Sequence, residues 1–282
     1  MAFPAVDNER LRASTVDGIF YPQQPARLRE AVRRLLDNSP ASADRAQSII
    51  SPHAAFDYSG EVAAAAFQAS AGRTVELAVL IGPVHREPAD AVLLSESHAY
   101  QTPLGDVRVD EELGQRLARF GPDFRYDEVP HLEEHCLEVQ LPFLQMLHPQ
   151  ARILPLLLGR PTRKRVERLA DALWELTRDR LDTTLFVVSS NMSTFLNTPE
   201  SAAQADAVLQ RITAMDWEPL VDRPGGRPLS PCGGGCIAAI LLLHRRIGGT
   251  ATVLARASSL PAGGDPERVV QYAAVALTAN ES

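Results

Sequence analysis

The sequence has no hydrophobic stretch long enough to cross a membrane, because none of its apolar runs approaches the roughly 20 residues that a transmembrane helix needs. Its first residues, Met1 to Asp7, lack the basic and apolar segments of a secretion signal. We therefore expect a cytoplasmic protein without a membrane partner.

Cysteine and excess positive charge are also scarce. Three cysteines in 282 residues do not make a disulfide framework, so each is a buried thiol, a ligand or a nucleophile. The net charge of -7 argues against a nucleic-acid partner. A local run of arginines at residues 160–165 is interpreted as the solvated start of a helix.

Short apolar runs alternate with amphipathic segments along the chain. Strands are expected at residues 47–51, 75–81, 91–94, 153–158, 184–189, 251–257 and 269–277. Helices are expected at residues 24–36, 62–70, 110–119, 134–147, 163–178, 202–215 and 237–246. Loops are expected at residues 100–105 and 225–235, and Pro142 should kink the helix at 134–147 or mark a late start. This order predicts an α/β fold with helices on both faces of a mostly parallel sheet, and no linker divides it, so residues 1–282 are expected to form a single domain.

Polar side chains follow the predicted strands. In such sheets ligands bind beyond the carboxyl ends of the strands, a rule that selects His53, His85, residues 190–194 and Cys232. A lone histidine in a loop is usually a surface or capping residue, but two imidazoles at neighbouring strand ends favour a metal site. Cys232 starts a Gly-rich segment before a helix, where the helix dipole favours a thiolate, and a buried structural thiol is the alternative.

Two further segments carry titratable groups. His135 and Glu138 lie three residues apart near the start of the predicted helix 134–147, so they are expected to share a face. They are either a general acid/base with its orienting carboxylate or simply helix-start residues next to acidic charge that the dipole favours. His244, near a predicted helix C-terminus, is favoured there by the helix dipole.

These segments, in this order, resemble the Memo family, the B component of the AmmeMemoRadiSam system. The matching motifs are residues 20–22, 51–53, 58–60, 82–85, 102–105, 134–144, 189–190 and 231–233. The string Glu-His-Cys-Leu-Glu-Val-Gln-Leu-Pro-Phe-Leu at 134–144 is the most specific of them. Together the matches cover nearly the whole chain.

The resemblance implies a three-layer α/β/α sandwich around a mostly parallel or mixed sheet, similar to class III extradiol dioxygenases. It also implies a metal site made of His53, His85 and Cys232, with Fe(II) as the first expectation and copper or zinc as alternatives. The two-His, one-Cys set is softer than the two-His, one-carboxylate triad of non-heme iron oxygenases. The partners it implies are a small molecule or peptide, and AMMECR-type and radical SAM proteins of the same system.

The chain departs from the family pattern beside this site. Asn191 stands where the family has an aspartate, and Thr194 stands where it has a histidine. Threonine cannot act as a base near neutral pH. Cys136 replaces the usual serine, and Cys236 is an extra thiol where proline is frequent.

Three functional hypotheses follow. The first is a metal-dependent, dioxygenase-like redox enzyme in which His135 with Glu138 transfers protons. The second is a non-catalytic scaffold that binds a peptide or partner in the same pocket, which the missing Asp and His favour. The third is a hydrolase with Ser189 or Ser190 as nucleophile, for which no Gly-x-Ser-x-Gly elbow is present.

Overall fold

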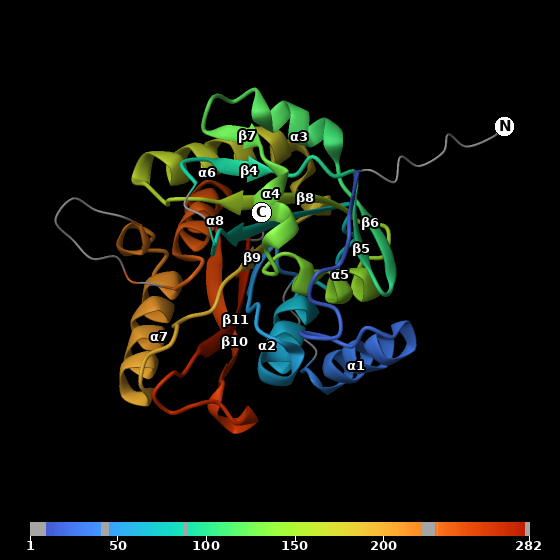
Figure 1. Cartoon of the computed structure of the whole chain (residues 1–282). Helices are drawn as coiled ribbons and strands as arrows, with labels where there is room; N and C mark the ends of the chain where they lie inside the picture. Colours follow the sequence, from blue (N-terminus) through green and yellow to red (C-terminus); the bar gives the residue numbers. More distant parts are fainter. Residues whose placement is uncertain (1–9, 41–44, 87–88, 222–228, 230, 280–282) are drawn as a thin grey trace.

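The computed structural model describes residues 10–40, 45–86, 89–221, 229 and 231–279. Its main sheet has eight strands in the order β10-β11-β2-β9-β3-β8-β4-β7. Figure 1 shows β10 and β7 at opposite ends of this sheet. These strands are β2 (Ser48–Ser51), β3 (Leu77–Pro83), β4 (Val92–Leu94), β7 (Phe124–Tyr126), β8 (Arg152–Leu158), β9 (Thr184–Ser189), β10 (Thr250–Ser258) and β11 (Gln271–Thr278). The central strands β2, β9, β3 and β8 are parallel, whereas β11 and β4 run antiparallel to their inner neighbours. The sheet is therefore mixed, with a parallel centre.

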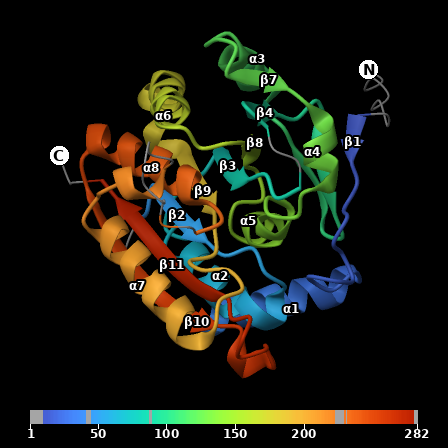
Figure 2. The same cartoon turned by 60° about the vertical axis from the view of Figure 1, so that its left-hand side comes forward.

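Helices cover both faces of this sheet. They are α1 (Pro25–Asn38), α2 (Phe56–Gln68), α3 (Glu111–Ala118), α4 (Glu128–Glu133), α5 (Leu141–Leu147), α6 (Arg163–Thr177), α7 (Thr198–Thr213) and α8 (Gly234–Ile247). Figure 2 shows α7 and α8 on one side of the sheet and α1, α2 and α5 on the other. Along β3, Ala78 and Leu80 join the core under α1, α2 and α5, and Val79 and Ile81 join the core under α6, α7 and α8. Because alternate side chains of a strand face opposite sides, a strand that is apolar throughout builds both cores. The three-layer α/β/α architecture is confirmed.

A second, three-stranded sheet lies beside the main one. It is formed by β1 (Leu11–Arg12), β5 (Ala99–Thr102) and β6 (Gly105–Arg108). The loop prediction for residues 100–105 is wrong, because β5 and β6 form a hairpin in which Thr102 pairs with Gly105. Gly105 has a φ of 119°, a value that favours glycine and permits the turn.

The helix predicted at 62–70 begins earlier, at Phe56. Ser59 and Gly60 are therefore inside the helix rather than before it. A Cβ on Gly60 would lie 2.9 Å from Leu35 Cδ1, so the glycine allows α1 and α2 to approach closely. The pair Ser-Gly is typical of a loop, whereas here close packing between two helices explains the glycine.

The single helix predicted at 134–147 is also wrong. Helix α4 ends at Glu133, Glu134 has extended φ and ψ angles, and helix α5 starts only at Leu141 after a short 3-10 turn at Glu138–Gln140. Pro142 lies in the first turn of α5, where its missing N–H costs nothing. The late start was the correct alternative. Residues 134–137 are consequently irregular, and this allows them to enter the site described next.

Candidate metal centre

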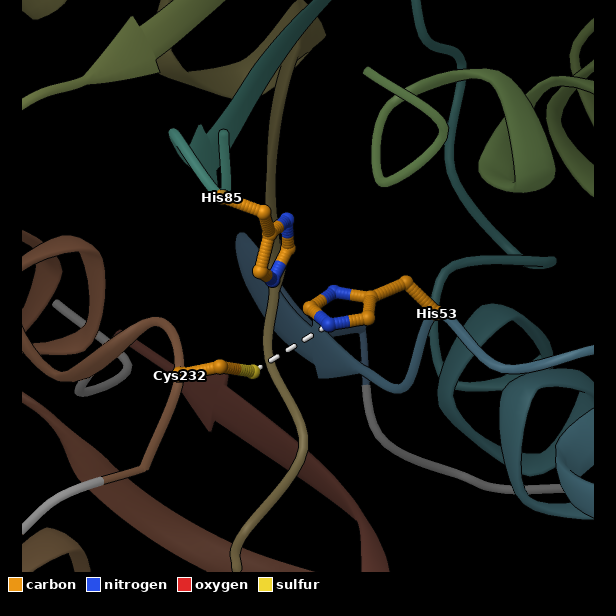
Figure 3. A group of neighbouring side chains, drawn as sticks. All are labelled: His53, His85 and Cys232. Carbon is orange, nitrogen blue, oxygen red and sulfur yellow. Dashed lines mark hydrogen bonds between the residues drawn. The ribbon is translucent and has the colours of Figure 1, made fainter. Parts of the chain in front are cut away.

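His53 and His85 are brought together by the parallel centre of the sheet. Strand β9 lies between β2 and β3 and is parallel to both, so the carboxyl ends of β2 and β3 lie on either side of it. His53 follows the end of β2 by two residues, and His85 follows the end of β3 by two. Their ring centroids are 5.1 Å apart (Figure 3). The strand-end rule therefore predicted the meeting of these residues correctly.

Cys232 joins them from the segment before α8. Its Sγ lies 3.1 Å from His53 Nε2 and accepts a hydrogen bond from the Asn191 N–H at 3.0 Å. Gly233 allows this approach, because a Cβ there would lie 2.7 Å from the Ser189 carbonyl oxygen. The ligand atoms of His53, His85 and Cys232 all lie within 4.8 Å of one another. The structure thus brings the three residues together, and their role as metal ligands stays a prediction.

Hydrogen bonding orients the His53 ring. The Ser189 hydroxyl donates to the Cys136 carbonyl oxygen at 2.7 Å, so at 2.8 Å from His53 Nδ1 its oxygen accepts the ring N–H. This contact orients the ring through Nδ1 and directs Nε2 toward Cys232 Sγ. Metal-binding histidines are commonly held by such a partner on the other nitrogen.

His85 is oriented by a carboxylate. Glu134 Oε2 lies 2.8 Å from His85 Nδ1, and Glu134 Oε1 accepts the His85 backbone N–H in a short hydrogen bond. Figure 3 shows the other ring nitrogen directed toward His53 and Cys232. Burial alone would lower the pKa of His85, but hydrogen bonds with Cys232 and Glu134 raise it to about 9. Burial likewise opposes ionisation of Glu134, yet its bonds with His85 keep the pKa of this carboxyl below its usual value.

The Cys232 sulfur is poised as a thiolate. Burial alone would raise its pKa, but His53, through its charge and a hydrogen bond, together with hydrogen bonds from His85 and the Asn191 N–H, lowers it to about 5. The other two thiols differ, because burial raises the pKa of both Cys136 and Cys236. A thiolate is the form of cysteine that binds metals. Of the three cysteines, Cys232 is therefore the best suited to bind a metal.

His135 enters the same pocket. Its ring centroid lies 5.5 Å from that of His53 and 5.3 Å from that of His85, and Phe20 packs against it at 4.9 Å. Burial, followed by the positive charges of His53 and His85, lowers the pKa of His135 to about 4. His135 is therefore neutral at pH 7.

Glu138 does not accompany His135, so the prediction that they share a helix face is wrong. The irregular backbone at residues 134–137 turns Glu138 away, and its carboxylate pairs with Arg12 at 2.6 Å with neither side chain exposed. It also accepts hydrogen bonds from the Tyr21 hydroxyl and the Thr15 N–H. The carboxylate beside His135 is instead Glu134, whose Oε2 is 3.9 Å from His135 Nδ1. Glu138 anchors the N-terminal segment.

The positions that depart from the family pattern are also visible. Asn191 is buried, and its side-chain oxygen accepts the His53 N–H at 3.2 Å. It therefore fills a structural role at the pocket wall. Thr194 is partly buried three residues further on.

Neither serine of the hydrolase hypothesis is poised as a nucleophile. Ser189 and Ser190 are fully buried. The Ser189 hydroxyl donates to a carbonyl rather than to His53, and the Ser190 hydroxyl donates to the Asn191 carbonyl at 3.1 Å. A serine nucleophile needs its hydroxyl directed to a base. The geometry therefore argues against a serine hydrolase.

The donor set suits a transition metal. Nitrogen and sulfur ligands bind zinc at about 2.0–2.3 Å, so three such atoms within 4.8 Å can surround one ion after small side-chain shifts. Imidazole suits iron, copper and zinc, and thiolate selects softer ions. Beside it, a cavity of about 330 Å³ is lined by His85, Arg86 and Cys232, among others. The residues fit a metal with room for a further ligand.

Sequence reasoning missed Glu134, Ser189 and Arg12 as supports of this site. Glu134 precedes His135 in the sequence, but acidic charge at that place is also typical of a helix start. Arg12 donates to the carbonyl oxygens of His131 and Glu134, both at 2.6 Å, and so fixes the segment that carries Glu134. The one signal in the sequence that could have indicated Glu134 is its position next to the candidate residue His135.

Fold and site together define an α/β protein with a candidate metal centre at the carboxyl edge of its sheet. Residues 12–276 match the family model described as Memo-like protein. The chain belongs to the Memo family.

Curated relatives agree with this assignment. A MEMO1 family protein of Methanobrevibacter smithii is 31% identical over 93% of this chain and 98% of its own length. Another, from Desulfurococcus amylolyticus, is 29% identical over 94% of this chain and 98% of its own length. A crystal structure of an uncharacterized protein from Escherichia coli K12 covers 86% of this chain and 91% of its own, with a TM-score of 0.44 and 14% identity. Within the described residues, no helix combines the length and hydrophobicity that spanning a bilayer requires.

Proposed function

We propose that this Memo-family protein is a metal-dependent, dioxygenase-like redox enzyme that holds Fe(II), or alternatively copper, at His53, His85 and Cys232. One observation carries the proposal: Ser189 and Glu134 occupy the Nδ1 atoms of the two histidines, so that both Nε2 atoms face Cys232. A bound iron or copper ion would supply one-electron redox chemistry and the activation of dioxygen.

The chain's own residues then bind and position the reactants. The cavity of about 330 Å³ beside Cys232 receives the substrate, a small molecule or peptide, and Arg86 on its wall favours a substrate with negative charge. His135, neutral at pH 7, accepts a proton from the substrate. Glu134, rather than Glu138, is the neighbouring carboxylate that stabilises the protonated ring.

Metal analysis tests this proposal. Protein purified without oxygen is expected to carry close to one equivalent of iron or copper, and the double variant His53→Ala, Cys232→Ser is expected to carry almost none, because only one nitrogen ligand remains. Cys236→Ser, a matched change of a neighbouring thiol, should retain the metal. Equal metal content in the wild type and the double variant would contradict the proposal.

A second candidate is a non-catalytic scaffold that binds a peptide, or an AMMECR-type or radical SAM partner, in this pocket. It is favoured by Asn191, which stands where the family has an acid and is already engaged with the His53 N–H. The two candidates separate on one property: a scaffold keeps its partner's affinity when chelation removes the metal, whereas the enzyme needs the metal.

A further inference from the structure

We propose a second metal position in the same pocket, formed by His85, Glu134 and His135, which overlaps the first because both use His85. It extends the proposed function by assigning harder ions to one position and softer ions to the other. The ligand atoms of these three residues also lie within 4.8 Å of one another.

The two positions lie on opposite edges of the His85 ring. One ring nitrogen faces His53 and Cys232 (Figure 3), and Nδ1 faces Glu134 Oε2 at 2.8 Å. The same Glu134 oxygen lies 3.9 Å from His135 Nδ1. The rings of His85 and His135 are stacked, with centroids 5.3 Å apart and an angle of 21° between their planes.

Glu134 and His135 are suited to accept an ion. Glu134 is only 3% exposed, its Oε1 is held by the His85 backbone N–H, and its Oε2 faces the Nδ1 atoms of both His85 and His135. The His135 side chain is 28% exposed, and neither of its ring nitrogens makes a hydrogen bond to another residue in the described ranges. A partly exposed imidazole without a hydrogen-bond partner, beside a fixed carboxylate, is a ready ligand pair.

The two donor sets differ in chemical softness. His53, His85 and Cys232 offer two nitrogens and a thiolate. Imidazole suits iron, copper and zinc, and the thiolate favours ions softer than Mn(II). His85, His135 and Glu134 offer two nitrogens and a carboxylate, and a carboxylate ligand suits a harder ion such as Mn(II). The identity of the ion therefore decides which position it occupies.

The shared histidine makes the two positions exclusive. A neutral imidazole has one lone pair, so it can serve one position at a time. With the ion beside Cys232, the proton stays on Nδ1 and is donated to Glu134. With the ion beside Glu134, the proton moves to Nε2 and is donated to the Cys232 sulfur. The pocket thus holds one ion in either of two places.

Binding of Mn(II) and Zn(II) to metal-free protein tests the proposal. Mn(II) is followed by electron paramagnetic resonance and Zn(II) by competition with a chelator. His135→Phe, which keeps the packing against Phe20, should weaken Mn(II) binding at least about tenfold and leave Zn(II) unchanged. Cys232→Ser should do the reverse, His85→Ala should weaken both, and Zn(II) should displace Mn(II) from the wild type.

Two variants serve as matched controls, and different results would contradict the second metal position and the proposed function. Cys236→Ser and His98→Ala, which change a thiol and a histidine outside both ligand sets, should bind both ions as the wild type does. The second position is refuted if His135→Phe binds Mn(II) like the wild type, or if Mn(II) and Zn(II) bind together. The proposed function fails separately, if Zn(II), iron and copper bind independently of Cys232 and His53.

Discussion

Glu138→Gln should lower the free energy of unfolding by about 3–5 kcal/mol, because it leaves the Arg12 charge buried without a counter-charge. Both side chains are fully buried, and their closest N–O distance is 2.6 Å. Glutamine keeps the shape of the side chain but not its charge. Guanidinium-induced unfolding, followed by circular dichroism, measures the loss.

A neighbouring pair provides a matched control. Arg10 and Glu111 also meet at 2.6 Å, but their side chains are 46% and 43% exposed. Water screens such a pair, so Glu111→Gln should cost less than about 1 kcal/mol. If the two variants lost similar amounts, burial would not be what makes the Arg12–Glu138 pair important.

His244→Gln should make the free energy of unfolding fall less steeply as the pH is lowered. Burial lowers the pKa of His244 to about 4, and its ring is held neutral 2.7 Å from Ser48 Oγ. In the unfolded chain a histidine titrates near 6.5, so between about pH 6.5 and 4 the unfolded state binds more protons than the folded state. The contribution of His244 is therefore complete above about pH 6.5 and is lost as the pH falls through 4.

The expected size is about 3 kcal/mol, since each pKa unit corresponds to about 1.4 kcal/mol. Unfolding free energies at pH 7 and pH 4.5 give the slope in each protein. The wild type should lose more stability than His244→Gln over this range. An unchanged slope would show that His244 takes up a proton without unfolding the protein. His148, whose pKa burial also lowers to about 4, keeps its own contribution in both proteins.

His244 also shows how two physical effects compete. Its position near the end of α8 led to the expectation that the helix dipole favours it there. The dipole contributes about 0.3–1 kcal/mol to a charged group. Burial at 1% exposure opposes the charge more strongly, so the ring is neutral. Burial depends on packing from distant segments and cannot be read from the helix alone.

The candidate ligands were predictable because their positions follow from local pattern and sheet geometry. Apolar runs located the strands, and parallel strands deliver His53 and His85 to one edge. The naming of Cys232 rather than Cys236 came from family resemblance. In the structure, Cys232 Sγ lies beside His53, and Cys236 lies buried inside α8.

The residues that hold the candidate ligands in place could not be predicted from local pattern and sheet geometry. Arg12 meets Glu138 across 126 positions of sequence, and nothing local to either residue indicates the other. Helical spacing predicted that Glu138 would lie beside His135. Because the chain is irregular between α4 and α5, Glu134 lies there instead. Side-chain direction in irregular segments depends on tertiary contacts.

The most direct test of the central claim is the absorption spectrum of Co(II) added to metal-free protein without oxygen. If Cys232 is a ligand, the wild type and Cys236→Ser should both develop a thiolate-to-metal charge-transfer band, and Cys232→Ser should not. A band that persists in Cys232→Ser, or that disappears only in Cys236→Ser, would contradict a metal centre made of His53, His85 and Cys232.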